Sequence, residues 1–182
     1  QSNIGNYHQI RAIADSESLK LRFSDLNIYK TYEPDGNISK KLYKIAEKIR
    51  YEKLGSEQFK GVKNNLENYY EERVNSLDLK SSEDKIVESF ENYFRSKFLN
   101  LKKNKALETK LKSYKKDLDD KFKNKLQGLN IVADNQAKFN SLVSELISEM
   151  SLDENQNEED KKDDENEEDK KREPKNFTKI FG

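Results

Sequence analysis

The chain has 182 residues, a length that suits one domain and a tail. Charged residues make up 38% of it and apolar residues only 32%, while 35 basic and 35 acidic residues cancel. Such a composition favours helices with narrow apolar stripes over a sheet buried on both faces. The chain has no cysteine, which excludes disulfides, thiolate metal sites and cysteine nucleophiles. Nothing resembles a signal peptide and no apolar run reaches transmembrane length, so we expect a cytoplasmic protein.

The first part of the chain predicts a small helix-and-strand element, to which we assign residues 1–37. Tyr7–Ala14 can form a short helix, and apolar and polar residues then alternate over 19–23 with the period of a half-exposed strand. Pro34-Asp35-Gly36 is a turn signal. His8 is the only histidine, and we interpret it as a surface residue because a metal site needs several donors.

Residues 38–152 predict a helical domain, because apolar residues recur there every three or four positions. The five stripes are Leu42–Ile49, Val62–Val74, Ile86–Leu101, Leu107–Leu126 and Phe139–Met150. Ser81-Ser82-Glu83-Asp84 is typical of a helix start with a serine cap and acids in the first turn. Gly55 and Gln127-Gly128 are typical of helix ends, so we expect the first and fourth helices to stop there. The predicted fold class is mostly α, a helical bundle.

Charge is distributed unevenly along the chain. Twelve Lys or Arg stand against four Asp or Glu in 93–126, whereas twelve acids stand against five bases in 153–173. The basic stretch suits either a solvated helix face or a docking surface for an acidic partner or for the tail itself. Residues 153–174 carry no large apolar side chain, so we predict a disordered acidic linker. Its acids have no loop to fix them as a cation site.

A set of residues in the first two helical stripes carries a family resemblance. They read E-x-x-R-x-E-x-x-G, then G-V and N-L: Glu47, Arg50, Glu52, Gly55, Gly61-Val62 and Asn65-Leu66. This order resembles the CobT family, the T subunits of aerobic, ATP-dependent cobaltochelatase. From the resemblance we take six residues as candidate partner-binding residues: Glu47, Arg50, Glu52, Gly55, Gly61 and Asn65.

Three other stretches are similar to the same family. The segment AIADSESLKLRFSD resembles its opening helix and strand, and Asp134–Phe139 resembles its D-Q-x-A-F turn, with one residue shifted. Phe177-Thr178 and Phe181 resemble the F-T-x-x-F element that follows its acidic linker and leads into a von Willebrand A domain. The resemblance therefore implies that 175–182 is the start of a missing C-terminal domain.

No phosphate-binding glycine-rich loop, catalytic triad or histidine pair is present in the sequence. We therefore expect no catalytic, cofactor-binding or metal-binding residue in this segment, and scattered lysines without an arginine cluster argue against nucleic acid. The resemblance implies an oligomeric complex with a AAA+ ATPase subunit and a large chelatase subunit. That complex uses ATP and Mg to insert cobalt(II) into a corrin ring, hydrogenobyrinic acid a,c-diamide. Two alternatives stay open: a AAA+/von Willebrand A pair with another client, and a generic helical interaction module.

Overall fold

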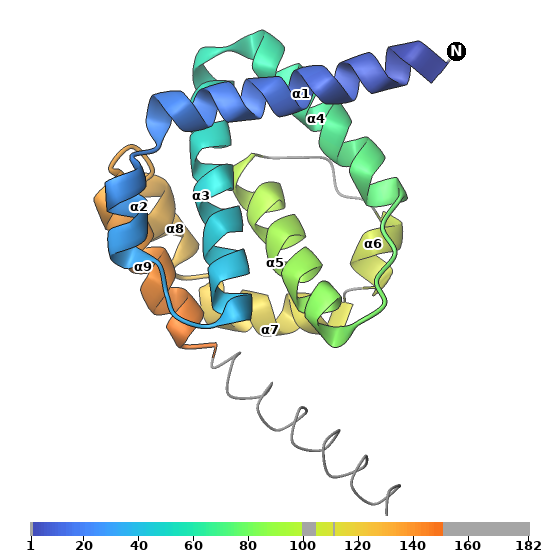
Figure 1. The fold of residues 1–182 in the computed structure, drawn as a ribbon. Helices are drawn as coiled ribbons and strands as arrows, with labels where there is room; N and C mark the ends of the chain where they lie inside the picture. Colours follow the sequence, from blue (N-terminus) through green and yellow to red (C-terminus); the bar gives the residue numbers. More distant parts are fainter. Residues whose placement is uncertain (1, 100–104, 111, 151–182) are drawn as a thin grey trace, which may run out of the picture.

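The computed structural model describes residues 2–99, 105–110 and 112–150, and every regular element in these ranges is an α-helix (Figure 1). The mostly-α prediction is therefore confirmed. In chain order the helices are α1 Ser2–Phe23, α2 Leu26–Tyr32, α3 Asn37–Gln58, α4 Lys60–Asn75, α5 Ser82–Phe98, α6 Lys105–Lys110, α7 Lys112–Phe122, α8 Leu126–Ile131 and α9 Gln136–Ser148. None of the helices within these ranges is both long and apolar enough to cross a membrane.

Helix α3 lies at the centre of the fold and packs against α1, α4, α5 and α9 (Figure 1). Its first stripe is buried as predicted, with Leu42, Ala46 and Ile49 fully inaccessible to solvent. These side chains join the aromatic face of α5 and the apolar faces of α7 and α9 in the main core. A second, smaller cluster lies between α1, the end of α3 and α4, and consists of Leu19, Tyr51, Leu66 and Tyr70.

The predicted strand at 19–23 is wrong, because α1 continues through these residues as a helix. Leu19 and Phe23 are four positions apart, so on a helix they share one side and pack against the smaller cluster. Leu21 points the other way and is 87% exposed. A lone strand would have left its backbone without a pairing partner, whereas the helix satisfies it internally.

Two predicted helix ends are also wrong. Gly55 lies inside α3, which ends at Gln58, so only Phe59 separates α3 from α4. Gly128 lies inside α8, and the preceding helix α7 ends at Phe122 instead. A glycine can stop a helix, but it can also continue one when neighbouring contacts favour the helical conformation.

Other sequence signals are confirmed. Ser81 caps α5 through a reciprocal capping box with Asp84, each accepting a hydrogen bond from the other's backbone N–H. Gly36 has a φ of 90°, a conformation that favours glycine, and it ends the predicted turn just before α3. The last stripe forms α9, capped by Asn135. The acidic linker 153–174 and the segment 175–182 lie outside the described residues and stay predictions, as do the positions of Leu101 and Leu111.

Candidate functional site

Glu47 and Arg50 of the signature form a buried ion pair on one side of α3. Glu47 is 3% exposed and Arg50 is 1% exposed. Arg50 donates to both carboxylate oxygens of Glu47, at 2.8 and 2.9 Å. A charge pair this far from water is stable only when further hydrogen bonds satisfy its remaining groups. The structure supplies them from segments distant in the sequence.

The groups that complete this pair come from the end of α1 and from the α8–α9 region. Arg50 also donates to the backbone carbonyls of Phe23 and Ala133. The Glu47 carboxylate accepts from the Ser24 hydroxyl and from Asn140 Nδ2, both at 2.7 Å. One ion pair on α3 thus holds α1 and α9 in place.

A glutamine strengthens the same junction. Gln136, at the start of α9, accepts from the backbone N–H of Asp25 at 2.7 Å and donates to its carbonyl at 3.0 Å. The side-chain amide therefore makes the same two hydrogen bonds with the α1–α2 link that the backbone of a neighbouring strand would make. The D-Q resemblance had marked this segment without giving Gln136 a role, and no sequence signal had marked Asn140.

Glu52, the second signature acid, forms a separate buried network toward α4 and α5. It is fully inaccessible, and it accepts hydrogen bonds from the Ser16 hydroxyl at 2.6 Å and the Tyr70 hydroxyl at 2.8 Å. It also accepts from Arg95 Nη1 at 2.6 Å. The Arg95 guanidinium lies 3.4 Å from the centroid of the Tyr70 ring, a cation–π contact. Four helices, α1, α3, α4 and α5, meet at this one carboxylate.

The network continues toward the surface along α5. Arg95 donates to Glu91 at 2.9 Å, and Arg73 of α4 pairs with Glu91 at 3.3 Å and with Glu88. Burial alone would raise the pKa of Glu91, but Arg95 and Arg73 hold it below the ordinary value. At Glu88 burial prevails over Arg73 and raises the pKa. The three carboxylates share two guanidiniums, so the network is an interior clamp between helices.

The surroundings of Gly55 explain why the signature has a glycine at this position. A Cβ atom built on it would lie 2.2 to 2.8 Å from the Leu19 side chain, closer than packed atoms approach. Leu19 is itself only 4% exposed, so it has little room to move away. The signature glycine therefore lets α1 cross α3 at close range.

We expect Gly55→Ala to lower the free energy of unfolding by about 1–3 kcal/mol, the usual cost of overpacking a filled site. Gly128→Ala is the matched control, because this glycine is also helical and a Cβ there would meet nothing within 4 Å. Without a clash, alanine should stabilise that helix by about 0.5–1 kcal/mol. Urea denaturation of both variants measures the difference. Equal effects at the two glycines would contradict the close approach of α1.

The last two candidate partner-binding residues, Gly61 and Asn65, lie on α4. Asn65 donates to the Asp15 carboxylate at 2.8 Å and so links α4 to α1. Gly61 is exposed, with open space around it. Partner binding by the six candidates stays a prediction. Because Glu47, Arg50, Glu52 and Gly55 are buried, any contribution from these four would act through the surfaces that they position.

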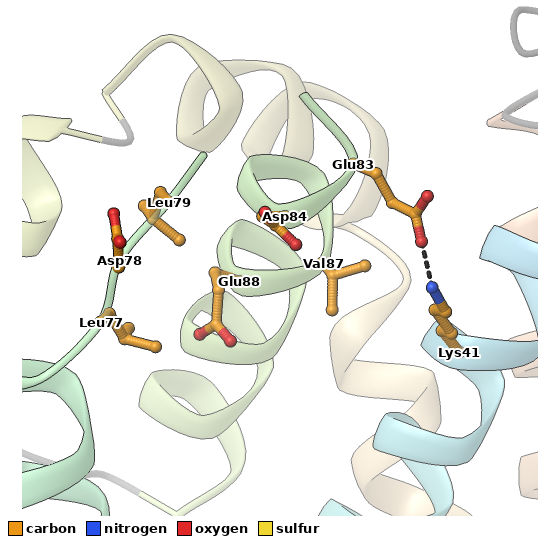
Figure 2. A pocket seen from close by; sticks show the side chains of 8 residues that line it. All are labelled: Lys41, Leu77, Asp78, Leu79, Glu83, Asp84, Val87 and Glu88. Carbon is orange, nitrogen blue, oxygen red and sulfur yellow. Dashed lines mark hydrogen bonds and ion pairs between the residues drawn. The ribbon is translucent and has the colours of Figure 1, made fainter. Parts of the chain in front are cut away.

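A pocket of about 140 Å³ lies where the segment after α4 meets the start of α5 (Figure 2). Four carboxylates and three apolar side chains line it beside Lys41. Each carboxylate has a partner: Glu83 pairs with Lys41, Asp84 with the Ser81 backbone, Glu88 with Arg73 and Asp78 with Lys80. The acids are therefore engaged with the protein itself.

Metal-binding geometry is absent from the part of the chain that the structure describes, where no three histidine or acidic side chains come together in a way that could hold an ion. The polar groups that are buried together instead join helices across the bundle. The class of protein defined by this arrangement is an all-α domain whose interior is fixed by two charged networks.

The comparison with protein families identifies the chain within this class. Residues 5–179 match the family described as "Cobalamin biosynthesis protein CobT". The chain therefore belongs to the CobT family, which confirms the resemblance seen in the signature residues. No curated protein and no solved structure matches it significantly.

Proposed function

We propose that this chain is the N-terminal, non-catalytic part of a cytoplasmic cobaltochelatase T subunit. In this role it binds a AAA+ ATPase partner, within a complex that also contains a large chelatase subunit. The observation that carries the proposal is membership of the CobT family over residues 5–179. ATP, Mg and the cobalt and corrin substrates would bind to other subunits of the complex.

The distribution of buried and exposed charge supports a binding role. The signature acids and Arg50 are used inside the bundle, where they hold α1, α3, α5 and α9 together. Most lysines of the basic stretch, in contrast, are exposed. Those with exposed side chains on α7 and in the turn after it are Lys112, Lys116, Lys121, Lys123 and Lys125.

We place the ATPase contact at the end of α7 and the turn after it, on the surface formed by the exposed Lys116, Lys121 and Lys123, which we call the lysine surface. Basic surfaces of this kind speed association with acidic partners, and the attraction weakens as the salt concentration rises. The six candidate partner-binding residues between 47 and 65 offer less, because four of them are buried. The exposed part of this stretch is the link between α3 and α4, residues 57–61, together with Lys63 and Asn64.

A pull-down of the 182-residue chain on immobilised ATPase subunit tests the proposal. We expect binding to weaken as salt rises past about 0.1 M, where the Debye length is about 10 Å. The triple variant K116E, K121E and K123E should bind at least tenfold more weakly. The matched control K30E, K40E and K44E reverses three other exposed lysines and should bind nearly as well as the wild type.

An ATPase assay of the chain alone accompanies the pull-down. We expect no hydrolysis above background, and robust hydrolysis would contradict the non-catalytic role. Failure of the wild-type chain to bind the ATPase would overturn the proposed partner. Equal losses in the two triple variants would overturn the lysine surface as the contact.

A further inference from the structure

Helix α1 packs on the bundle with one side and leaves large apolar side chains exposed on the other. It lies across one end of the molecule (Figure 1), and its packed side includes Ala12, Ser16 and Leu19, which are at most 4% exposed. The other side carries four large apolar residues that are half or more exposed: Tyr7 (59%), Ile10 (58%), Ile13 (50%) and Leu21 (87%). Apolar side chains gathered on one exposed side of a helix mark an interaction surface.

Four residues on this exposed side form a narrow stripe, which we call the α1 stripe: Tyr7, Ile10, Ala14 and Leu21. At 3.6 residues per turn they fall within a sector of about 60° around the helix. Glu17 and Ser18 lie at the two edges of this sector, in the two turns between Ala14 and Leu21, and both are exposed. The α1 stripe is therefore large and apolar at both ends, and small or polar in the middle.

This order of side chains is complementary to itself when it is reversed. Tyr7 and Leu21 are each seven residues from Ala14. Two α1 helices that cross antiparallel near Ala14 therefore bring Leu21 of one copy beside Tyr7 and Ile10 of the other. The side chains at the crossing, Ala14 and Ser18, are small, and small side chains let two helix axes approach closely.

The charges beside the α1 stripe agree with the same arrangement. Arg11 and Glu17 are both exposed, and each is three residues from Ala14 in opposite directions along the chain. An antiparallel crossing at Ala14 puts Glu17 of one copy at the level of Arg11 of the other, and two-fold symmetry makes this pair twice. The acid that interrupts the apolar side chains within one copy thus meets a base from a second copy.

We propose that the exposed side of α1 is a self-association surface, at which two copies of this chain pair through antiparallel α1 helices. The contact goes beyond the proposed function and needs no ATPase subunit. Residues 7–21 span about 21 Å of helix, and the 39% exposed Phe59 adds apolar area beside Arg22. An interface of this length is small, so we expect a reversible dimer with a dissociation constant in the micromolar range.

Sedimentation equilibrium of the 182-residue chain tests the pairing. We expect the average mass to rise from 21.4 kDa toward twice that value as the protein concentration increases. Leu21→Asp puts a charge into the apolar contact and should raise the dissociation constant by about tenfold or more. Ile131→Asp is the matched control, because Ile131 is 73% exposed on a different helix, and it should leave the dissociation constant unchanged.

An exchange of charges tests the antiparallel orientation. Arg11→Glu and Glu17→Arg each place like charges at the same level, so each alone should weaken the pairing by about threefold or more. The two changes together restore opposite charges and should return the dissociation constant to within about twofold of the wild-type value. Helicity by circular dichroism should be the same in all three variants, because both residues are exposed.

Disulfide trapping gives a second readout of the geometry, since the chain has no cysteine of its own. Ala14→Cys lies at the crossing and should form covalent dimers about tenfold faster than Lys40→Cys, which is exposed on α3. Leu21→Cys should react slowly although Leu21 is 87% exposed. In the antiparallel pair its two copies are 14 residues apart along the helices, a separation of about 21 Å.

Four results would overturn the proposal. A mass of 21.4 kDa at every concentration would show that the chain does not pair. Equal trapping of Ala14→Cys and Lys40→Cys, or faster trapping of Leu21→Cys, would exclude the crossing at Ala14. A charge exchange that does not restore pairing would exclude the antiparallel orientation. Self-association that survives Leu21→Asp but is lost in the triple variant K116E, K121E and K123E would move the contact to the lysine surface.

Discussion

Replacing Glu52 with glutamine is expected to lower the free energy of unfolding by about 3–5 kcal/mol, the usual cost of breaking a buried ion pair from one side. The carboxylate is fully inaccessible and accepts from Ser16, Tyr70 and Arg95. Without it, the Arg95 charge stays in the interior with Glu91 as its remaining carboxylate partner in the described chain. Urea denaturation at neutral pH measures the loss.

Glu57→Gln is the control for this prediction. Glu57 is on the same helix and pairs with Lys53, but its side chain is 58% exposed. Exposed i,i+4 pairs contribute about 0.3–0.5 kcal/mol, so this change should be small. A loss below about 1 kcal/mol for Glu52→Gln, comparable with that control, would show that the network does not hold the four helices together.

A double variant separates the charge from the packing. If Arg95→Met is combined with Glu52→Gln, both charges of the pair are removed, so neither is left buried without the other. The loss of unfolding free energy should then be smaller than the sum of the two single losses. Contacting residues in one network commonly show coupling of about 0.5–3 kcal/mol. Strict additivity would mean that the two side chains act independently, against the 2.6 Å contact between them.

The sequence predicted the helical elements because their signals are local. Apolar spacing located the buried stripe of α3, and the segment of two serines and two acids at 81–84 located the start of α5. The errors at 19–23 and Gly55 have one physical origin. Alternation over five residues and a single glycine fit two local structures equally well, and contacts between α1 and α3 decide the outcome.

The buried networks could not be predicted from the sequence, for the same reason. Glu47 meets Asn140 across 93 positions, and Glu52 meets Arg95 across 43. No spacing rule connects residues so far apart, so the signature could be recognised as a pattern but not explained. The structure gives the explanation: Glu47 and Arg50 face α1 and α9, while Glu52 and Gly55 face α1, α4 and α5. One helix thereby sets the positions of its neighbours.

The aromatic stripe of α5 gives the second large effect. Phe94 is 1% exposed, and its ring stacks on Phe90 at 4.3 Å between centroids and on Phe98 at 5.6 Å. It also meets the edge of Phe122 from α7 at 5.7 Å. Phe94→Ala would leave a cavity between these rings. We expect it to cost about 3–5 kcal/mol, because truncation of a fully buried aromatic side chain loses both transfer free energy and packing.

Urea denaturation of Phe94→Ala, read by circular dichroism, measures this loss, with the m-value expected to stay constant. Ile131→Ala is the control, since this side chain is 73% exposed and its truncation should change stability by less than about 0.5 kcal/mol. Leu111, which the same stripe pattern marks as a core residue, lies outside the described residues and is not a substitute. If Phe94→Ala costs no more than Ile131→Ala, then α5 does not pack on α7 through this ring, and the contact that closes the bundle on that side must be another one.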